Sequence, residues 1–215
     1  MSLISLKNLT KILLILIWVN QLFGLFGIMY IDFDLFLSLS PISLLTTFLV
    51  VMYSNIEFLY KSYGLVLLII IVSMVSEIIG VNSGLLFGSY YYGENLGISI
   101  FGVPIVIGLN WVVLTISCGN ISNYIFSKNK IFSILLGSFL MLFLDVIMEQ
   151  VSGNIDFWYF NDDNLIYNYV CWFLLGLLNQ YIYQNFLNKK CIIISINIYI
   201  SFIIFFLVLN FKEYV

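Results

Sequence analysis

The sequence predicts an all-α integral membrane protein, a bundle of about seven transmembrane helices forming a single polytopic domain over residues 1–215. Three observations carry this prediction. Hydrophobic residues make up 62% of the chain and charged residues only 9%, a balance typical of membrane proteins. Apolar runs recur at lengths near the roughly 20 residues that a helix needs to cross a bilayer. The lysines fall almost entirely in alternate connections between those runs.

Seven apolar runs, separated by polar or charged breaks, are the predicted spans. They cover residues 12–30, 35–53, 64–81, 103–121, 131–150, 165–187 and 191–210. The first run is too long and too lightly charged at its start for a cleaved signal peptide, and it has no small-residue cleavage site. We therefore count it as a span.

Lysine placement orients the bundle, because the chain has no arginine and positive charge marks the cytoplasmic side. The lysines before span one or in the second, fourth and sixth connections are Lys7, Lys11, Lys61, Lys128, Lys130, Lys189 and Lys190. Only Lys212, after the last span, falls on the other side. We expect a cytoplasmic amino terminus, an outer carboxyl terminus and the cell membrane of a prokaryote.

The predicted outer face is acidic and carries the long connections. Its carboxylates are Asp32, Asp34, Glu94, Asp156, Asp162 and Asp163. The two longest connections, about 82–102 and 151–164, both lie there. We expect a functional site to open on this side.

Composition excludes several functional classes. A net charge of -3 without basic clusters argues against a nucleic-acid partner. The chain has no histidine and no paired cysteine spacing, which removes histidine-based metal and haem sites. The last span, "CIIISINIYISFIIFFLVLN", has no lysine for a retinal Schiff base. We expect membrane lipids as surroundings, and neither a metal nor another cofactor.

Three carboxylates lie within or at the edge of the apolar runs: Glu77, Asp145 and Glu149. A carboxylate at the centre of a span costs about 2.5–3.5 kcal/mol on the insertion scale, so it seldom lies there without a partner or a task. With a rise of about 1.5 Å per residue, Glu77 should lie roughly 6 Å and Asp145 roughly 8 Å inside their outer helix ends. One pocket could collect all three.

Asp145 and Glu149 lie four residues apart in "LDVIMEQ", which puts both carboxyls on one helix face. Two such groups in a poor dielectric do not both ionise easily. A protonated acid beside a carboxylate results, which is the pairing that acid–base chemistry needs. The alternative is a structural role, in which the two carboxyls hydrogen-bond neighbouring helices, or in which Glu149 is simply solvated at the membrane interface.

Other polar and aromatic groups are expected near the same depth. Asn110 precedes Trp111, and Asn168 lies shortly before Trp172. Asparagines often join membrane helices by hydrogen bonds, so each has a structural alternative. Tyr90, Tyr91, Tyr92, Trp158 and Tyr159 lie in the outer connections. An interfacial aromatic belt is the structural alternative for any of them.

Three blocks of sequence carry a family resemblance. The stretch "EIIGVNSGLLFGSYYYGENLG", followed by "FGVPIVIGLNW", has the order Glu, Gly-Val, a small hydroxyl residue with Gly, Phe-Gly, Tyr-x-Tyr, Pro and Trp. The others are "LDVIMEQVSGNIDFWYF" and "NYVCWF". Together they cover about residues 70–186, and they resemble the membrane-bound carotenoid biosynthesis protein family, which includes hydratases of the bisanhydrobacterioruberin type. Gln150, Leu165 and Tyr167 depart from the family pattern, and Ser83 replaces its more usual threonine.

The resemblance implies an enzyme, a carbon–oxygen hydro-lyase, that adds water across a terminal C=C bond of an acyclic C40 or C50 carotenoid. The partners are then a lipid-soluble carotenoid and water, and the product is a tertiary alcohol. A neutral carboxylic acid in apolar surroundings can protonate such an alkene without a cofactor. Aromatic faces stabilise the resulting cation.

Roles follow from the resemblance and this chemistry. We assign Asp145 as proton donor, Glu77 as the carboxylate that orients or deprotonates water, and Glu149 as a group that exchanges with either. The expected substrate-binding residues are Tyr90, Tyr92, Asn110, Trp111, Trp158, Asn168 and Trp172. The expected loop glycines, which let the backbone turn and approach closely, are Gly80, Gly84 and Gly88. Close helix packing is their alternative reading.

Three other functions stay open on the sequence. A carotenoid cyclase or isomerase would use the same proton donor but quench the cation with an internal double bond. A proton-coupled transporter would load protons on Glu77 and Asp145. A non-catalytic membrane assembly factor would leave the carotenoid unchanged.

Overall fold

The protein is described by a computed structural model over residues 3–161, 165–185 and 191–212. The helices are α1 (Leu3–Tyr30), α2 (Phe33–Ser38), α3 (Ser40–Ser54), α4 (Ile56–Ser83), α5 (Ile105–Ile125), α6 (Lys130–Ser152), α7 (Leu165–Asn185) and α8 (Ile192–Lys212). Short strands are β1 (Tyr90–Tyr92), β2 (Ser99–Ile100), β3 (Val103–Pro104) and β4 (Trp158–Phe160). Of the residues used to predict the topology, Asp162, Asp163, Lys189 and Lys190 lie outside the described ranges.

The prediction of an all-α membrane bundle with about seven spans is confirmed. Seven stretches of the described chain are helical, long and apolar enough to cross a membrane. They are Asn8–Tyr30, Phe33–Ser54, Tyr63–Ser83, Ile105–Ile125, Lys130–Ser152, Leu165–Asn185 and Ile192–Phe211. Their ends lie within a few residues of the predicted ones.

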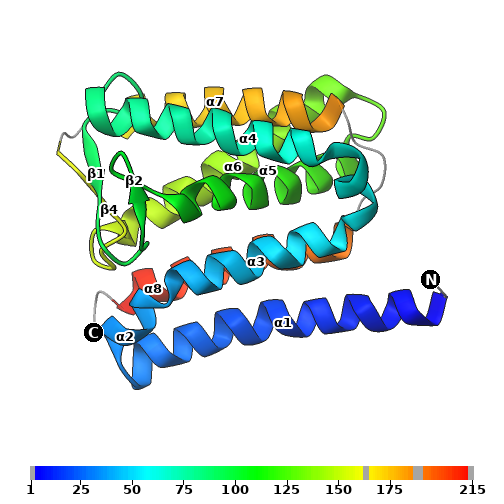
Figure 1. Cartoon of the computed structure of the whole chain (residues 1–215), viewed down its shortest axis with the longest axis horizontal. Coiled ribbons are helices and arrows are strands. Elements are labelled where there is room, and N and C mark those ends of the chain that lie inside the picture. The colour runs from blue at the N-terminus through cyan, green and yellow to red at the C-terminus, as the bar shows by residue number, and fades with distance from the viewer. Residues whose placement is uncertain (1–2, 162–164, 186–190, 213–215) are drawn as a thin grey trace.

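The second span is interrupted near its start. Asp32 caps α2 by accepting a hydrogen bond from the Leu35 N–H (2.9 Å). The helix then stops at Leu39, and Pro41 lies in the first turn of α3. Proline suits a helix start because its missing N–H would be unpaired there in any case. The break gives α2 and α3 separate directions at this end of the bundle (Figure 1).

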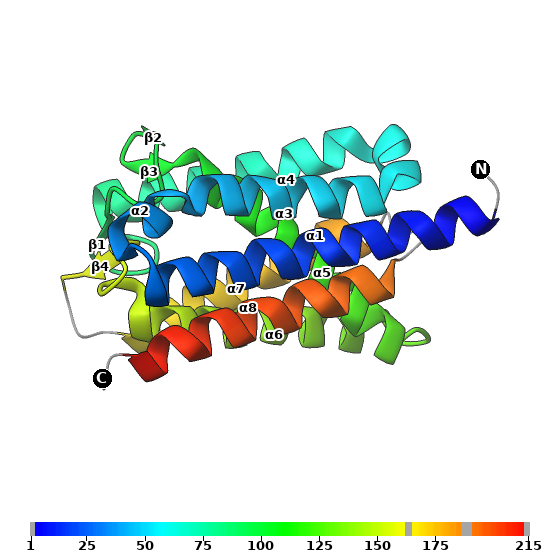
Figure 2. The same ribbon diagram turned by 90° about the horizontal axis from the view of Figure 1, so that it is seen from below.

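Helix α5 is the centre of the bundle. It packs against α3, α4, α6, α7 and α8. In its most apolar stretch 72% of the residues are buried, the largest share among the seven spans. Helices α4 and α7 cover one side of it, and α3 and α8 cover the other (Figure 1). Helix α1 packs on α3 and α8 at the edge of the bundle (Figure 2).

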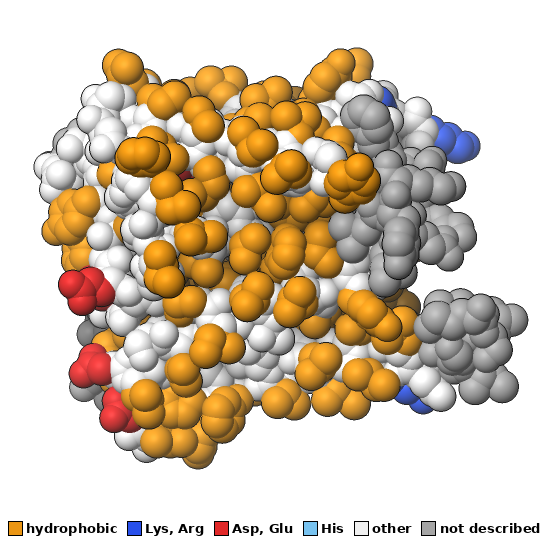
Figure 3. Space-filling model, in the orientation of Figure 1, with side chains coloured by type: hydrophobic (Ala, Val, Ile, Leu, Met, Phe, Trp, Pro, Cys, Tyr) orange, Lys and Arg blue, Asp and Glu red, His pale blue; other side chains and the backbone are white. Residues whose placement is uncertain are grey.

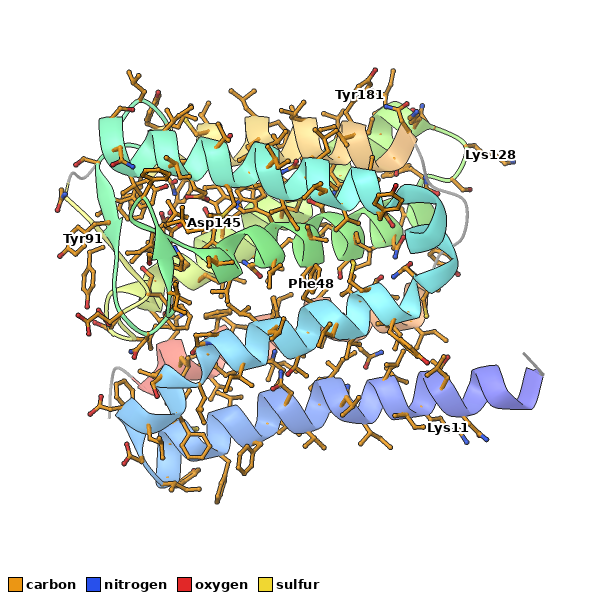
Figure 4. All side chains as sticks on the ribbon, viewed as in Figure 1. Lys11, Phe48, Tyr91, Lys128, Asp145 and Tyr181 are labelled. Atoms are coloured by element: carbon orange, nitrogen blue, oxygen red, sulfur yellow. The ribbon has the colours of Figure 1, made fainter. Side chains whose placement is uncertain are left out.

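The two ends of the bundle differ in charge. Acidic side chains on the visible face gather at the end that carries α2, β1 and β4, which we call the loop end (Figure 3). Lys11 and Lys128 lie at the opposite end (Figure 4). The two termini also lie at opposite ends. A cytoplasmic location for the lysine end remains a prediction.

Two long connections meet at the loop end as a small sheet. Strand β1 pairs antiparallel with β4, Tyr90 facing Phe160 and Tyr92 facing Trp158. Asp156 reinforces this join, because its Oδ2 accepts from the backbone N–H groups of Glu94 (2.8 Å) and Asn95 (3.3 Å). The sequence predicted connections here, without strands. The sheet thus joins the two long connections, and β1 packs against α4.

Candidate active site

Glu77 is a buried carboxyl whose two oxygens both accept hydrogen bonds. It lies six residues before the end of α4, or about 9 Å inside it, and is only 3% exposed. Its Oε2 accepts from the hydroxyls of Tyr90 (2.5 Å) and Tyr92 (2.8 Å). Its Oε1 accepts from the Trp111 indole N–H (2.9 Å). Two elements that follow α4 in the chain, β1 and α5, thus hold one carboxyl of α4.

Glycines in the connection after α4 bring the tyrosines back to Glu77. Gly84 ends the helix in the left-handed conformation (φ 66°), and its N–H bonds the Gly80 carbonyl (2.8 Å). Gly88 has a φ of 89°, so it also takes a conformation that disfavours other residues. At Gly80 the need is space, because a Cβ would lie 2.9 Å from both the Tyr90 hydroxyl and the Phe87 ring.

The two tyrosines facing Glu77 act as hydrogen-bond donors over the physiological range. Burial, together with the charge of Glu77, raises the pKa of the Tyr90 and Tyr92 hydroxyls above their ordinary value. Loss of either proton would put a second negative charge beside a buried carboxyl. Both hydroxyls therefore stay neutral and keep pointing at Oε2.

Asp145 lies on α6, seven residues before its end, or about 10 Å inside it. It is 1% exposed, and its Oδ2 has no hydrogen-bond partner among the described residues. Glu149 lies one turn further along α6 and accepts from the Asn168 amide of α7 (2.5 Å). Asn168 and Asp145 line the same cavity. Asp145 and Glu149 thus form a pair on one helix face, linked through α7.

Aromatic rings close the site. Trp111 stacks on Trp172 with ring centroids 4.1 Å apart and planes within 18°. Phe87 packs against Trp172 on one side and edge-on against Tyr90 on the other. Phe87 has a φ of 65°, a strained conformation for a bulky residue and of the kind that concentrates at functional sites. These rings give the carboxyls an apolar surrounding with exposed π faces.

One cavity collects nearly all of the predicted site. Nine of the ten predicted catalytic and substrate-binding residues line it: Glu77, Tyr90, Tyr92, Asn110, Trp111, Asp145, Trp158, Asn168 and Trp172. The tenth, Glu149, borders it through its bond to Asn168. The cavity leaves about 30 Å³ in which the centre of a water molecule fits, above the roughly 10–15 Å³ that one water needs.

Polar atoms without partners face this cavity. Besides Oδ2 of Asp145, the Oδ1 atoms of Asn110 and Asn168 are buried without a hydrogen bond among the described residues. A buried acceptor that lacks a donor costs about 1–3 kcal/mol. Since water supplies donors, a water molecule in the cavity would satisfy these acceptors.

The predicted residues differ in how they contribute to this geometry. Asp145 lies inside the bundle, whereas Tyr91 points outward from the strand (Figure 4) and stacks on Tyr159 at the surface. Gly84 and Gly88 make turns, and Gly80 makes the close approach.

Other lining residues were missing from the predicted site. They are Phe87, Ile107, Met148 and Phe160. Phe87 stands in the first resembling block, and its Phe-Gly pattern could have identified it. Phe160 reaches the cavity through the pairing of β4 with β1. Ile107 lies three residues before Asn110, and Met148 lies three residues after Asp145. Helical spacing could have indicated the last two.

The described residues contain no group of three or more His, Cys, Asp or Glu side chains arranged to hold a metal ion. The groups that line the cavity or border it are two buried carboxyls, a third half-buried one, hydroxyl and indole donors, and aromatic rings. This set can donate, accept and relay protons next to an apolar molecule.

Comparison with known proteins gives one match. A family model described as carotenoid biosynthesis protein matches residues 39–214. The match includes every helix that contributes to the cavity and extends beyond the predicted 70–186 on both sides. Comparisons with curated proteins and with solved structures give no match.

Proposed function

The chain belongs to the carotenoid biosynthesis protein family and acts in carotenoid biosynthesis in a membrane, and from this premise we propose that it is a carotenoid hydratase. Its reaction adds water to a terminal C=C bond of an acyclic carotenoid and gives a tertiary alcohol. The observation that carries the proposal is the cavity in which Glu77 and Asp145 meet, buried among tryptophans and tyrosines. Neither carboxyl has a basic partner in the described chain, so acid–base work explains their burial better than charge pairing does.

Asp145 is the proton donor in this mechanism. Its Oδ2 has no hydrogen-bond partner in the part of the chain that the structure describes, so a proton on that oxygen is available to the alkene. Transfer to the less substituted alkene carbon forms a C–H bond and leaves a tertiary carbocation on the neighbouring carbon. The stacked Trp111–Trp172 pair and the rings around it stabilise that charge through their π faces.

Glu77 is the proton acceptor. Three hydrogen bonds from neutral donors suit a carboxylate, which can only accept. Water attacks the cation and forms the C–O bond, and Glu77 takes the proton that the water loses. Asn110 orients the water through its free Oδ1.

Glu149 restores the starting state. It is half-buried at the loop end and joined to Asn168, so it can pass a proton between the outside and Asp145 after each cycle. No net proton is consumed, because Asp145 loses one and Glu77 gains one. Exchange through water in the cavity, or through Glu149, returns the proton to Asp145.

The test uses protein purified in a mild detergent, an acyclic carotenoid with an isopropylidene end, and mass analysis of the product. Hydration predicts a gain of one water, with ¹⁸O incorporated from labelled water. The variant Asp145→Asn should lower turnover by about 10²–10⁴-fold, the range for loss of a general acid. The control Asp34→Asn, at an exposed position of α2 at the same end of the bundle, should keep full turnover.

Three results would contradict the proposal. Turnover that leaves the substrate mass unchanged would establish cyclisation or isomerisation. Folded protein that leaves the carotenoid unchanged would favour an assembly role. Full turnover by Asp145→Asn would remove Asp145 as donor.

A further inference from the structure

A second and larger cavity adjoins the cavity that Glu77 and Asp145 line, which we call the acid cavity. It lies between α1, α2, α3 and α8 and leaves about 220 Å³ in which the centre of a water molecule fits, compared with about 30 Å³ in the acid cavity. Ile107, Asn110, Met148 and Trp158 line both cavities. These four residues therefore form a shared wall between the large cavity and the cavity that holds the carboxyls.

The walls of the large cavity suit hydrocarbon. Phe36, Phe205 and Phe206 contribute aromatic rings to it. Asn20 and Ser43, two of its polar residues, pair with each other within the wall: the Asn20 amide donates to the Ser43 hydroxyl (2.9 Å) and carbonyl (3.2 Å). Both hydrogen bonds of this pair would therefore persist with an apolar molecule in the cavity.

The large cavity also reaches the membrane-facing surface. Phe23 of α1 and Ile42 of α3 line it, yet they are 59% and 61% exposed. Both lie within spans that cross the membrane, where the neighbouring medium is lipid. An apolar molecule dissolved in the bilayer can reach the cavity sideways, between α1 and α3, without passing through water.

We propose that this cavity binds the hydrocarbon segment of the acyclic carotenoid that adjoins its reacting end group. The inference rests on the proposed function, because a substrate whose end group reacts at the acid cavity needs a further site for the rest of its chain, and the large cavity adjoins it. The end group then reaches the shared wall at Asn110 and Met148, with Asp145 one turn before Met148 on α6. Hydrocarbon then approaches the carboxyls from the large cavity, and water is held beside them in the acid cavity.

Helix α1 gains a role in substrate selection through this geometry. Asn20, Phe23 and Gly24 of α1 line the cavity, whereas the family match begins at residue 39. The acid site lies within the matched part, and one wall of the hydrocarbon site lies before it. Side chains of α1 should therefore control which chain length or shape is accepted, without touching the carboxyls.

Gly24 offers a direct test, because a Cβ there would meet only the Phe205 ring, at the ordinary contact distance of 3.7 Å. The variant Gly24→Leu should fill part of the cavity and raise the Kd for the carotenoid at least tenfold. Gly24→Ala should have a smaller effect in the same direction. Gly64→Leu is the matched control, because a Cβ at Gly64 meets nothing within 4 Å, and it should bind within twofold of the wild type.

Binding is followed by the absorption change of the polyene and by quenching of tryptophan fluorescence, so no turnover is needed. A thermal melt of each variant checks that it is folded. Equal affinity in folded Gly24→Leu, Gly64→Leu and wild type would overturn the proposal, as would a wild type that binds no polyene. Loss of a copurified phospholipid in Gly24→Leu, with carotenoid affinity unchanged, would make the cavity a lipid site and also overturn it.

The same assay separates this inference from the proposed function. Asp145→Asn should bind the carotenoid as the wild type does and fail in turnover. If Asp145→Asn turns over normally while Gly24→Leu loses binding, the acid assignment is wrong and the hydrocarbon site stands. If Asp145→Asn is inactive and Gly24→Leu binds normally, the hydrocarbon site is wrong and the acid assignment stands.

Discussion

Removing both tyrosine hydroxyls from Glu77 should cost more than the sum of the two single removals. Tyr90→Phe leaves Oε2 of Glu77 with the Tyr92 hydroxyl, and Tyr92→Phe leaves it with that of Tyr90. A hydrogen bond to a charged group contributes about 1.5–3 kcal/mol, so each single variant should lower the free energy of unfolding by about 1.5–2 kcal/mol. The double variant leaves a buried carboxylate oxygen without a donor. Since groups in one network couple by about 0.5–3 kcal/mol, we expect a total loss of about 4–5 kcal/mol.

The assay is reversible unfolding in mixed micelles, followed by helical circular dichroism and compared over the full double-mutant cycle. Tyr91→Phe is the control from the same strand. Its side chain is 49% exposed, and its ring can still stack on Tyr159, so its stability should change by no more than about 0.5 kcal/mol. Losses that add within about 0.3 kcal/mol would refute the reasoning. They would mean that the two hydroxyls do not share one charged acceptor.

Two further predictions concern the lysine half of the bundle and the loop end. Gly119→Ala should lower the free energy of unfolding by about 1–3 kcal/mol in the same assay, because its Cβ would lie 2.6 Å from the buried Tyr183 ring. Gly153→Ala is the control: Gly153 has a helical φ of -65°, and a Cβ there would lie 3.5 Å from the nearest ring atom. This variant should leave the free energy of unfolding unchanged. The Tyr159 hydroxyl donates to Asp156 (2.9 Å), and this bond raises its pKa above 10.0. The contribution of this hydrogen bond to stability is thus present at neutral pH and is lost as pH rises through the raised pKa of Tyr159. Between about pH 8 and about pH 11 the melting temperature should therefore fall more in the wild type than in Tyr159→Phe. Equal falls in the two proteins would contradict this assignment.

The helices of this fold could be predicted because the cost of exposing backbone and polar groups to lipid is local. A run of about 20 apolar residues is enough to define a span wherever it lies in the chain. The same property hides the packing, because a helix that is apolar all round shows no preferred face. Helix α5 differs, because it carries buried small and polar residues such as Ser117, Gly119 and Asn120, which are typical of helix interfaces. They indicate burial, but they do not say which helices are the neighbours.

The site could be predicted in part, because its charges are costly where they lie. Glu77 and Asp145 attract notice as carboxyls within apolar runs, and similar depths in two helices suggest a common pocket. Which helices are neighbours does not follow from depth. The family resemblance supplied the aromatic and amide residues, and their convergence on one cavity depends on contacts between α4, α5, α6 and α7.

Other features depend on pairing between distant segments and could not be predicted. Strand β1 meets β4 across more than 60 residues of intervening chain, and each strand alone is three residues long. The positive φ of Phe87 is set by the turns at Gly84 and Gly88 on either side. The large cavity has walls from the first and last spans, and its shape follows from how α1 and α8 pack.

Hydration and cyclisation share the protonation step, so the nucleophile nearest the cation decides between them. Cyclisation requires the chain to fold back and bring an internal double bond to the cation, in a space from which water is excluded. The acid cavity offers about 30 Å³, and unpartnered oxygens of Asn110 and Asp145 face it. Those atoms favour a bound water beside the carboxyls, and a water held there is a nucleophile that cyclisation would have to exclude. An extended chain that lies in the large cavity and brings only its end group to the carboxyls, beside a bound water, therefore favours C–O bond formation over ring closure.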